Sequence, residues 1–206
     1  MEIAEQITSR RERRRFETRA KLLAAALELI TTKGYVATSI DDIARLADVA
    51  RGTALNYFPL KEDYLSAIVV ERQEAFRQTL TRVAEAAPSA LQGIIQAFMA
   101  QARSYENEEQ TSRPLVREWL RAGGPMLSGA DDSIAALSAV ITLAKDRGEV
   151  ASDVNPTDAS TLLLDAYLGA LVRWAGNADI HSSLRRPLGR TLKLLMRSIS
   201  PSQNEE

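Results

Sequence analysis

The chain has 206 residues, of which 45% are hydrophobic and 26% charged, and its formal net charge is −1. This composition predicts a folded protein with a substantial core and excludes general disorder. The absence of cysteine excludes disulfides and Cys-ligated metals, and a single histidine, His181, argues against a His-based zinc site or a Ser-His-Asp triad. No apolar run approaches the ~18 residues of a membrane span. We therefore expect a cytoplasmic protein that is not an enzyme and that holds no metal and no cofactor.

Positive charge is concentrated near the N-terminus. Residues 10–21 contain seven basic side chains against Glu12 and Glu17, although the whole chain is almost neutral. Residues 1–16 lack an apolar face and are predicted to form a basic flexible arm. Such an arm is either a solvated tail or a segment that reaches DNA phosphates or the minor groove.

The next segment predicts a helix from about Glu17 to Lys33. Apolar residues recur there at helical spacing, and Gly34 can take the left-handed conformation that ends a helix. Thr38 then has the chemistry of an N-cap, with Asp41 three residues later. A second helix is expected from there to Ala47.

A third, short helix is predicted from Arg51 to Phe58, after a turn at residues 48–50, and Pro59 ends it. Two short helices joined by a tight turn form a helix-turn-helix, which presents its second helix to a DNA groove. The inward side chains are expected to be Ile43, Ala47, Val49, Ala54 and Phe58.

The motifs G-Y-x-x-T-S-x-D-D-I-A from residue 34, G-T at 52–53 and N-Y-F-P-x-K-E at 56–62 resemble the TetR family of one-component transcriptional regulators. The resemblance covers roughly residues 18–66. Members of that family are all-α homodimers that repress transcription until a small molecule binds the C-terminal domain. The resemblance implies an all-α fold, with a three-helix helix-turn-helix DNA-binding domain at residues 17–62 and a helical ligand-binding and dimerisation domain at 63–206.

The expected DNA contacts lie on the two short helices and just after them. Arg51 is the best candidate for a guanine contact, whereas Asn56, Tyr57 and Lys61 would position phosphates. The full set of expected DNA-binding residues is Thr38, Ser39, Arg51, Gly52, Thr53, Leu55, Asn56, Tyr57 and Lys61.

Three positions depart from the family pattern. Asp48 and Ala50 replace the usual glycine and serine of the turn, and Leu55 replaces a tyrosine that bonds a phosphate. Aspartate tolerates a left-handed bend. Ala50 offers no capping oxygen, which costs ~0.5–2 kcal/mol. The operator contacts, rather than the fold, are therefore in question.

A ligand pocket is expected among the middle helices of the second domain. For any single residue, a place in the ordinary core is the alternative interpretation. The expected lining is Phe98, Met99, Ala102, Tyr105, Trp119, Leu120, Leu137, Ile141 and Tyr167. Arg103, Arg117 and Glu118 either orient a polar ligand or form exposed ion pairs.

The last two helices carry long apolar rows, and the first of them starts at Asn155-Pro156, an N-cap followed by a proline at N1. These rows either complete the monomer core or form the dimer seam that the resemblance implies. The expected interface is Leu162, Ala166, Gly169, Ala170, Arg173, Trp174, Leu188, Leu192, Leu195 and Ile199.

A two-fold dimer would place two reading helices in major grooves ~34–36 Å apart. The expected partners are therefore a second copy of the chain, a palindromic double-stranded DNA operator and a small-molecule effector, with no membrane. Repression and activation both remain open, as does a helical ligand- or partner-binding protein without specific DNA binding.

Overall fold

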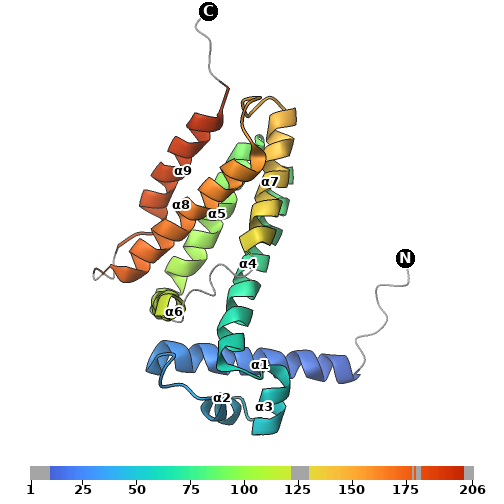
Figure 1. Cartoon of the computed structure of the whole chain (residues 1–206), viewed down its shortest axis with the longest axis vertical. Helices are drawn as coiled ribbons and strands as arrows, with labels where there is room; N and C mark the ends of the chain where they lie inside the picture. Colours follow the sequence, from blue (N-terminus) through green and yellow to red (C-terminus); the bar gives the residue numbers. More distant parts are fainter. Residues whose placement is uncertain (1–9, 122–129, 178, 180–181, 202–206) are drawn as a thin grey trace, which may run out of the picture. The chain divides into compact units, whose positions relative to one another are not determined.

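The computed structural model describes residues 10–121, 130–177, 179 and 182–201, and every regular element within them is a helix (Figure 1). The all-α fold expected from the sequence is therefore confirmed. The chain divides into two compact units, Met1–Ile68 and Val69–Glu206. The division falls within a long helix rather than at its start. His181 lies outside the described residues.

The first unit contains α1 (Arg10–Lys33), α2 (Ile40–Leu46), α3 (Arg51–Tyr57) and the first turns of α4 (Lys61–Ala86). Its core is formed by apolar side chains one helical turn apart on each helix, among them Leu22, Ala26 and Ile30 of α1 and Ile43 of α2. Gly34 ends α1 with a left-handed φ of 86°, as the sequence predicts.

The first helix begins at Arg10, seven residues before the predicted start. Arginine is a strong helix former, and the ion pair of Arg13 with Glu17 one turn later supports the extension. Residues 10–16 are therefore helical, which corrects the prediction of a flexible arm for them. The remaining residues of that predicted arm, 1–9, lie outside the described part of the chain.

The cap of α2 is one residue later than predicted. Ser39 Oγ accepts the backbone N–H of Asp42 at 3.1 Å, and the Asp42 carboxylate accepts the backbone N–H of Ser39, which completes a capping box. Thr38 is instead buried, and its hydroxyl donates to the carbonyl of Gly34 at 2.9 Å. The assignment of Thr38 as N-cap is therefore wrong.

The second unit contains the rest of α4 and five more helices of the described chain: α5 (Ala90–Asn107), α6 (Glu109–Arg121), α7 (Ala130–Asp146), α8 (Pro156–Gly176) and α9 (Arg185–Ile199). α8 packs against α6, α7 and α9, and α5 packs against the same three helices (Figure 1). α8 starts at the predicted Asn155 cap, whose side chain accepts the backbone N–H groups of Thr157 and Asp158. α6 starts at Glu109 and contains Pro114.

Two helices of this unit are capped by carboxylates that are distant in sequence. Glu149, after α7, accepts the Ser89 hydroxyl at 2.7 Å and the backbone N–H groups of Ala90 and Leu91 at the start of α5. Glu106 accepts the backbone N–H groups of the first residues of α9 in the same way. None of the described helices is long and apolar enough to cross a membrane.

Candidate functional site

The turn between α2 and α3 has the geometry of a helix-turn-helix. Asp48 takes a left-handed φ of 55°, and the backbone N–H of Val49 donates to the carbonyl of Ala44 at 3.0 Å. The sequence prediction that aspartate can replace glycine at this bend is confirmed. Val49 itself is half-buried rather than fully inward.

The reading helix α3 is anchored by Ala54, which is fully buried, and by Phe58 at its C-cap. Arg51, Gly52 and Asn56 are exposed, and Thr53, Leu55 and Tyr57 are half-buried. Ala50 is the N-cap and its side chain gives no capping hydrogen bond, as expected. A row of mostly polar side chains therefore faces outward on a helix with an incomplete cap.

Arg51 has a partner within the same surface. Its Nε lies 2.5 Å from Oδ1 of Asp41 in the first turn of α2, and the two side chains are 68% and 56% exposed. An exposed ion pair of this kind contributes at most ~1 kcal/mol. Arg51 can therefore exchange the Asp41 carboxylate for a base edge at little cost.

Lys61, a predicted phosphate contact, already has a partner within the first unit. Its Nζ donates to the carbonyl of Tyr35 at 2.9 Å and lies 4.2 Å from the centre of the Tyr35 ring. The lysine therefore ties the start of α4 to the end of α1. It retains two further N–H donors for a phosphate.

Arginines of α1 lie beside two of the predicted DNA-binding residues of α3. A surface groove of about 450 Å³ is lined by Asn56 and Tyr57, the expected phosphate contacts, and by four residues of α1: Glu12, Arg14, Arg15 and Thr18. Arginines are the preferred partners of phosphate oxygens. The basic N-terminal segment therefore shares one surface with α3, as a helix and not as an extended arm.

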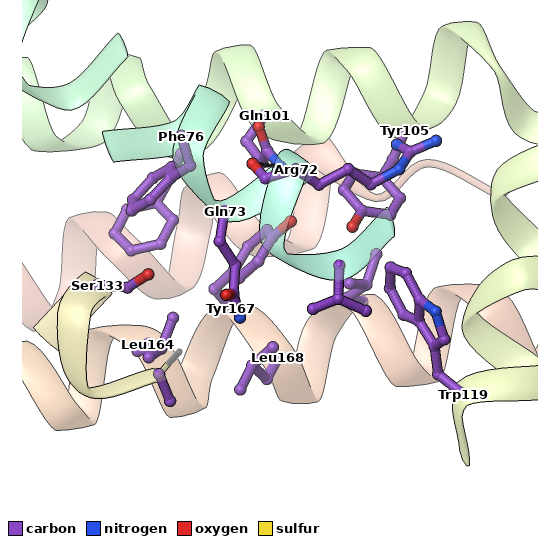
Figure 2. A pocket seen from close by; sticks show the side chains of 14 residues that line it. Arg72, Gln73, Phe76, Gln101, Tyr105, Trp119, Ser133, Leu164, Tyr167 and Leu168 are labelled. Atoms are coloured by element: carbon purple, nitrogen blue, oxygen red, sulfur yellow. Dashed lines mark hydrogen bonds between the residues drawn. The ribbon is translucent and has the colours of Figure 1, made fainter. Parts of the chain in front are cut away.

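The second unit contains a cavity of about 50 Å³ (Figure 2). Four of the expected ligand-pocket residues line it: Phe98, Tyr105, Trp119 and Tyr167. The ring centroids of Phe98 and Tyr167 are 5.4 Å apart, and those of Phe98 and Phe76 are 4.9 Å apart. Much of the wall is thus a row of aromatic rings.

The other expected pocket residues lie elsewhere. Ala102, Leu137 and Ile141 are fully buried in the core without lining the cavity, and Leu120 is 47% exposed. Met99 lies in a separate surface groove of the same unit, together with Arg103. The helical period explains the difference for α5, because the lining positions 98, 101 and 105 share one face and position 99 lies about 100° away.

The polar part of the lining was not predicted. Arg72, Gln73, Gln101 and Ser133 face the cavity. For Arg72 and Gln73 a signal exists, because they fall one turn before the buried Phe76 on an otherwise apolar row. Ser133 and Gln101 stand in helices whose orientation the sequence alone does not define.

Two phenols within the lining, those of Tyr105 and Tyr167, are buried. Burial raises the pKa of Tyr105, an effect that the nearby Arg72 opposes, and burial together with Tyr105 raises the pKa of Tyr167 well above 10. Both phenols therefore keep their protons at neutral pH. Each can donate a hydrogen bond to a molecule in the cavity.

Comparison with known proteins identifies the reading unit. Residues 22–68 match the family described as bacterial regulatory proteins, tetR family. Over 163 residues the chain is 28% identical to the HTH-type transcriptional regulator UidR of Escherichia coli K12, which covers 75% of this chain and 80% of UidR. The chain belongs to the TetR family. It is accordingly a DNA-binding transcriptional regulator.

Other members support the assignment along the whole length. The HTH-type transcriptional repressor KstR of Rhodococcus jostii RHA1 is 24% identical over 204 residues, 87% of this chain and 83% of KstR. Among solved structures, SmeT of Stenotrophomonas maltophilia matches with a TM-score of 0.76 at 20% identity, over 91% of this chain and 94% of SmeT. At that identity the structural likeness shows the TetR fold alone.

The residues expected at the dimer seam of this TetR-family chain divide into two groups. Ala170, Trp174, Leu188, Leu192 and Ile199 are buried within the unit and complete its core. The remaining members are exposed or half-buried on α8 and α9: Leu162, Ala166, Gly169, Arg173 and Leu195. Leu194, which the sequence analysis did not include, is 68% exposed.

Proposed function

We propose that the protein is a homodimeric repressor that binds a palindromic DNA operator and leaves it when a small molecule enters the cavity of the second unit. The observation that carries the proposal is the continuity of α4. This single helix provides Lys61 and Tyr64 to the reading unit and Arg72 and Phe76 to the cavity. A ligand that displaces the cavity segment of α4 therefore acts on the helix that holds the reader.

Dimerisation is supported by the apolar side chains that α8 and α9 leave uncovered. Leu162 and Leu194 are 51% and 68% exposed, and the small Ala166 and Gly169 allow a neighbouring helix to approach closely. A two-fold dimer of this kind presents two copies of α3. That arrangement requires an operator with two matching half-sites.

At the operator, Arg51 would contact a guanine and α1 would neutralise phosphates. Arg51 stands at the first position of α3, and its ion-pair partner within the described part of the chain is the exposed Asp41. Arg14 and Arg15 line a groove beside Asn56 and Tyr57, which fits one phosphate strand passing between α1 and α3.

The test begins with selection of bound duplexes from a random DNA library, followed by gel-shift titration of the selected site at several salt concentrations. Arg51→Ala should cost ~1–3 kcal/mol on the selected site and relax the preference at one base pair. Arg14→Ala should weaken all duplexes alike and reduce the salt slope by about one. Arg82→Ala, an exposed arginine of α4 in the second unit, serves as the control.

Recovery of no selected sequence, or no retardation even at low salt, would rule out the proposed function. Equal loss of specificity in the Arg51 and Arg14 variants would instead reject the division between base and phosphate contacts. The dimer is tested separately, because Leu194→Glu should convert the protein to a monomer in analytical ultracentrifugation and weaken operator binding.

A further inference from the structure

The chemistry of the cavity in the second unit restricts the effector. Among the described residues that line it, Arg72 is the only charged side chain, and none of these residues is a carboxylate. Such a site has no group that would neutralise a cation. It can neutralise an anion.

Arg72 has partners within the protein, but its guanidinium keeps N–H groups that a ligand could accept. Its Nη2 donates to Oε2 of Glu108 at 3.0 Å, and its guanidinium lies 4.8 Å from the centre of the Tyr105 ring. Arg72 is 16% exposed, whereas Glu108 is 56% exposed and is not part of the lining. Figure 2 shows the Arg72 side chain extending toward Tyr105. The remaining N–H groups of the guanidinium can bind a carboxylate.

A second donor stands beside Arg72. The Tyr167 hydroxyl is buried, and no described residue gives it a hydrogen bond of ordinary geometry, although weaker hydrogen-bond interactions with Tyr105 and Gln101 contribute to its pKa. In Figure 2 this hydroxyl points toward the helix that carries Arg72. A buried hydroxyl whose hydrogen bonds have poor geometry would bind favourably to a ligand oxygen placed as a better acceptor.

The rest of the wall is apolar, and the aromatic rings of Phe76 and Phe98 lie close together within it. The cavity of about 50 Å³ holds little more than a water molecule, so a ligand must displace side chains to enter. Arg72 and Gln101 are long side chains on two of the helices that would then separate.

We infer that the effector is a molecule with a planar apolar body and one carboxylate, in which the carboxylate is bound by Arg72 and the Tyr167 hydroxyl. The inference rests on the proposed function, since it takes the cavity as the effector site. It goes beyond that function in assigning the chemical class of the ligand and the two residues that select it.

The test uses three probes with one apolar skeleton and different polar groups: 2-naphthoic acid, 2-naphthamide and 2-naphthylmethylamine. Their binding to the full chain without DNA is measured by calorimetry. The acid should bind at least tenfold more tightly than the ammonium compound, with the neutral amide between them. Equal or tighter binding of the ammonium compound, or no saturable binding of any probe, would overturn the inference.

Two substitutions locate the effect. Arg72→Met should weaken the acid about tenfold or more and the amide much less, while Tyr167→Phe should weaken both by a smaller factor. Arg82→Met, at an exposed arginine of the same helix, is the matched control and should leave all three affinities unchanged. An unchanged ratio of acid to amide in Arg72→Met would reject the assignment of Arg72.

Folding of each variant is checked by circular dichroism, and Ser133→Leu offers an independent approach. Ser133 is buried in the lining, so a leucine there should fill the cavity and abolish binding of all three probes. The experiments can reject the proposed function and the proposed ligand class independently. A chain that binds naphthoate but no DNA rejects only the proposed function, and one that selects an operator but prefers the ammonium probe rejects only the ligand class.

Discussion

The two units of the chain use polar side chains in opposite ways. In the first unit the ion pairs lie at the surface, as in Arg51 with Asp41 and Arg45 with Asp42. In the second unit Arg113 of α6 is only 4% exposed, and its guanidinium donates to the carbonyl of Trp174 in α8. The first arrangement lets charged groups change partners at little cost, whereas the second fixes helices to one another.

This difference suits the two tasks. A DNA reader needs arginines that can leave their partners when a nucleic acid arrives. A unit that responds to a ligand needs helices that move as whole bodies, and buried polar networks join helices in discrete arrangements. The predictions below test the contrast, beginning with the network that we expect to contribute most.

Arg113 on α6 joins the end of α8 to the residues that follow it. Its Nη1 donates to the carbonyl of Trp174 at 2.6 Å, its Nη2 to the Ser182 hydroxyl at 3.0 Å, and its guanidinium lies 4.4 Å from the centre of the Trp174 ring. Arg113→Met should therefore lower the free energy of unfolding by about 3 kcal/mol, because buried carbonyls lose their donor. Denaturant titration measures the loss.

The matched control for Arg113 is Arg45→Met in the first unit. Arg45 is 77% exposed and pairs with Asp42 on its own helix, so its loss should cost less than about 0.5 kcal/mol. If the two substitutions destabilised the protein equally, the contrast between surface and buried polar groups would be wrong.

The same contrast explains how far the sequence could be interpreted. In the first unit Asp48 and Ala50 are fixed by neighbours within a few residues, so spacing and capping chemistry predict their places. Arg113 contacts residues more than 60 positions away. Its charge and its position before Pro114 resemble those of any exposed helical arginine. Packing between distant segments, which no local pattern records, decides its burial.

The cavity shows the same limit. Helical spacing identified Phe98, Tyr105, Trp119 and Tyr167 as candidates because aromatic residues at that spacing face inward. It did not distinguish the cavity wall from the closed core around Ile141, because both are apolar rows. Only the relative rotation of the helices separates them.

One glycine substitution within each unit tests how closely its helices pack. A Cβ on Gly93 in α5 would lie 2.8 Å from Cα of Ala84 and 3.0 Å from the carbonyl oxygen of Val83, both backbone atoms of α4. Gly93→Ala should therefore cost about 2 kcal/mol by forcing α4 and α5 apart. The melting temperature of the Gly93→Ala variant should fall accordingly.

Gly52 in α3 is the counterpart in the first unit. A Cβ there meets nothing within 4 Å, so Gly52→Ala should raise the stability by up to ~1 kcal/mol through helix propensity. Opposite signs for the two glycine substitutions support the packing described here. A stabilising Gly93→Ala would refute the close approach of α4 and α5.

Substitutions at the N-caps of α2 and α3 should change the stability of the first unit by smaller amounts, one as a gain and the other as a loss. Ala50 has the extended backbone of an N-cap, with φ −65° and ψ 143°, but no capping oxygen. Ala50→Ser should add about 1 kcal/mol, and Ser39→Ala, which removes the capping box of α2, should lose a similar amount. Thermal unfolding of both variants checks the pair, and no gain from Ala50→Ser would mean that another group already satisfies the start of α3.

The smallest effect is the pH dependence of a cap in the second unit. Partial burial alone would raise the pKa of Glu149, but hydrogen bonds from Ser89 and from the amides of Ala90 and Leu91, with Arg147 nearby, lower it below its ordinary value of 4.5. A carboxyl group with a lowered pKa stabilises the fold above its ordinary pKa, and this contribution is lost as the pH falls below about 4.5 through the folded-state value.

Glu149→Gln should accordingly lower the melting temperature at neutral pH and flatten its decline on the acid side. The matched variant in the first unit is Asp42→Asn, since hydrogen bonds from Ser39 lower the pKa of Asp42 as well. Asp42 caps its own helix and meets α1 through a 3.8 Å ion pair with Lys33, whereas Glu149 accepts three hydrogen bonds at the start of α5 from its position after α7. We therefore expect the loss of Glu149 to flatten the acid side more than the loss of Asp42. Equal acid profiles for the wild type and Glu149→Gln would show that this carboxylate does not hold the two helices together.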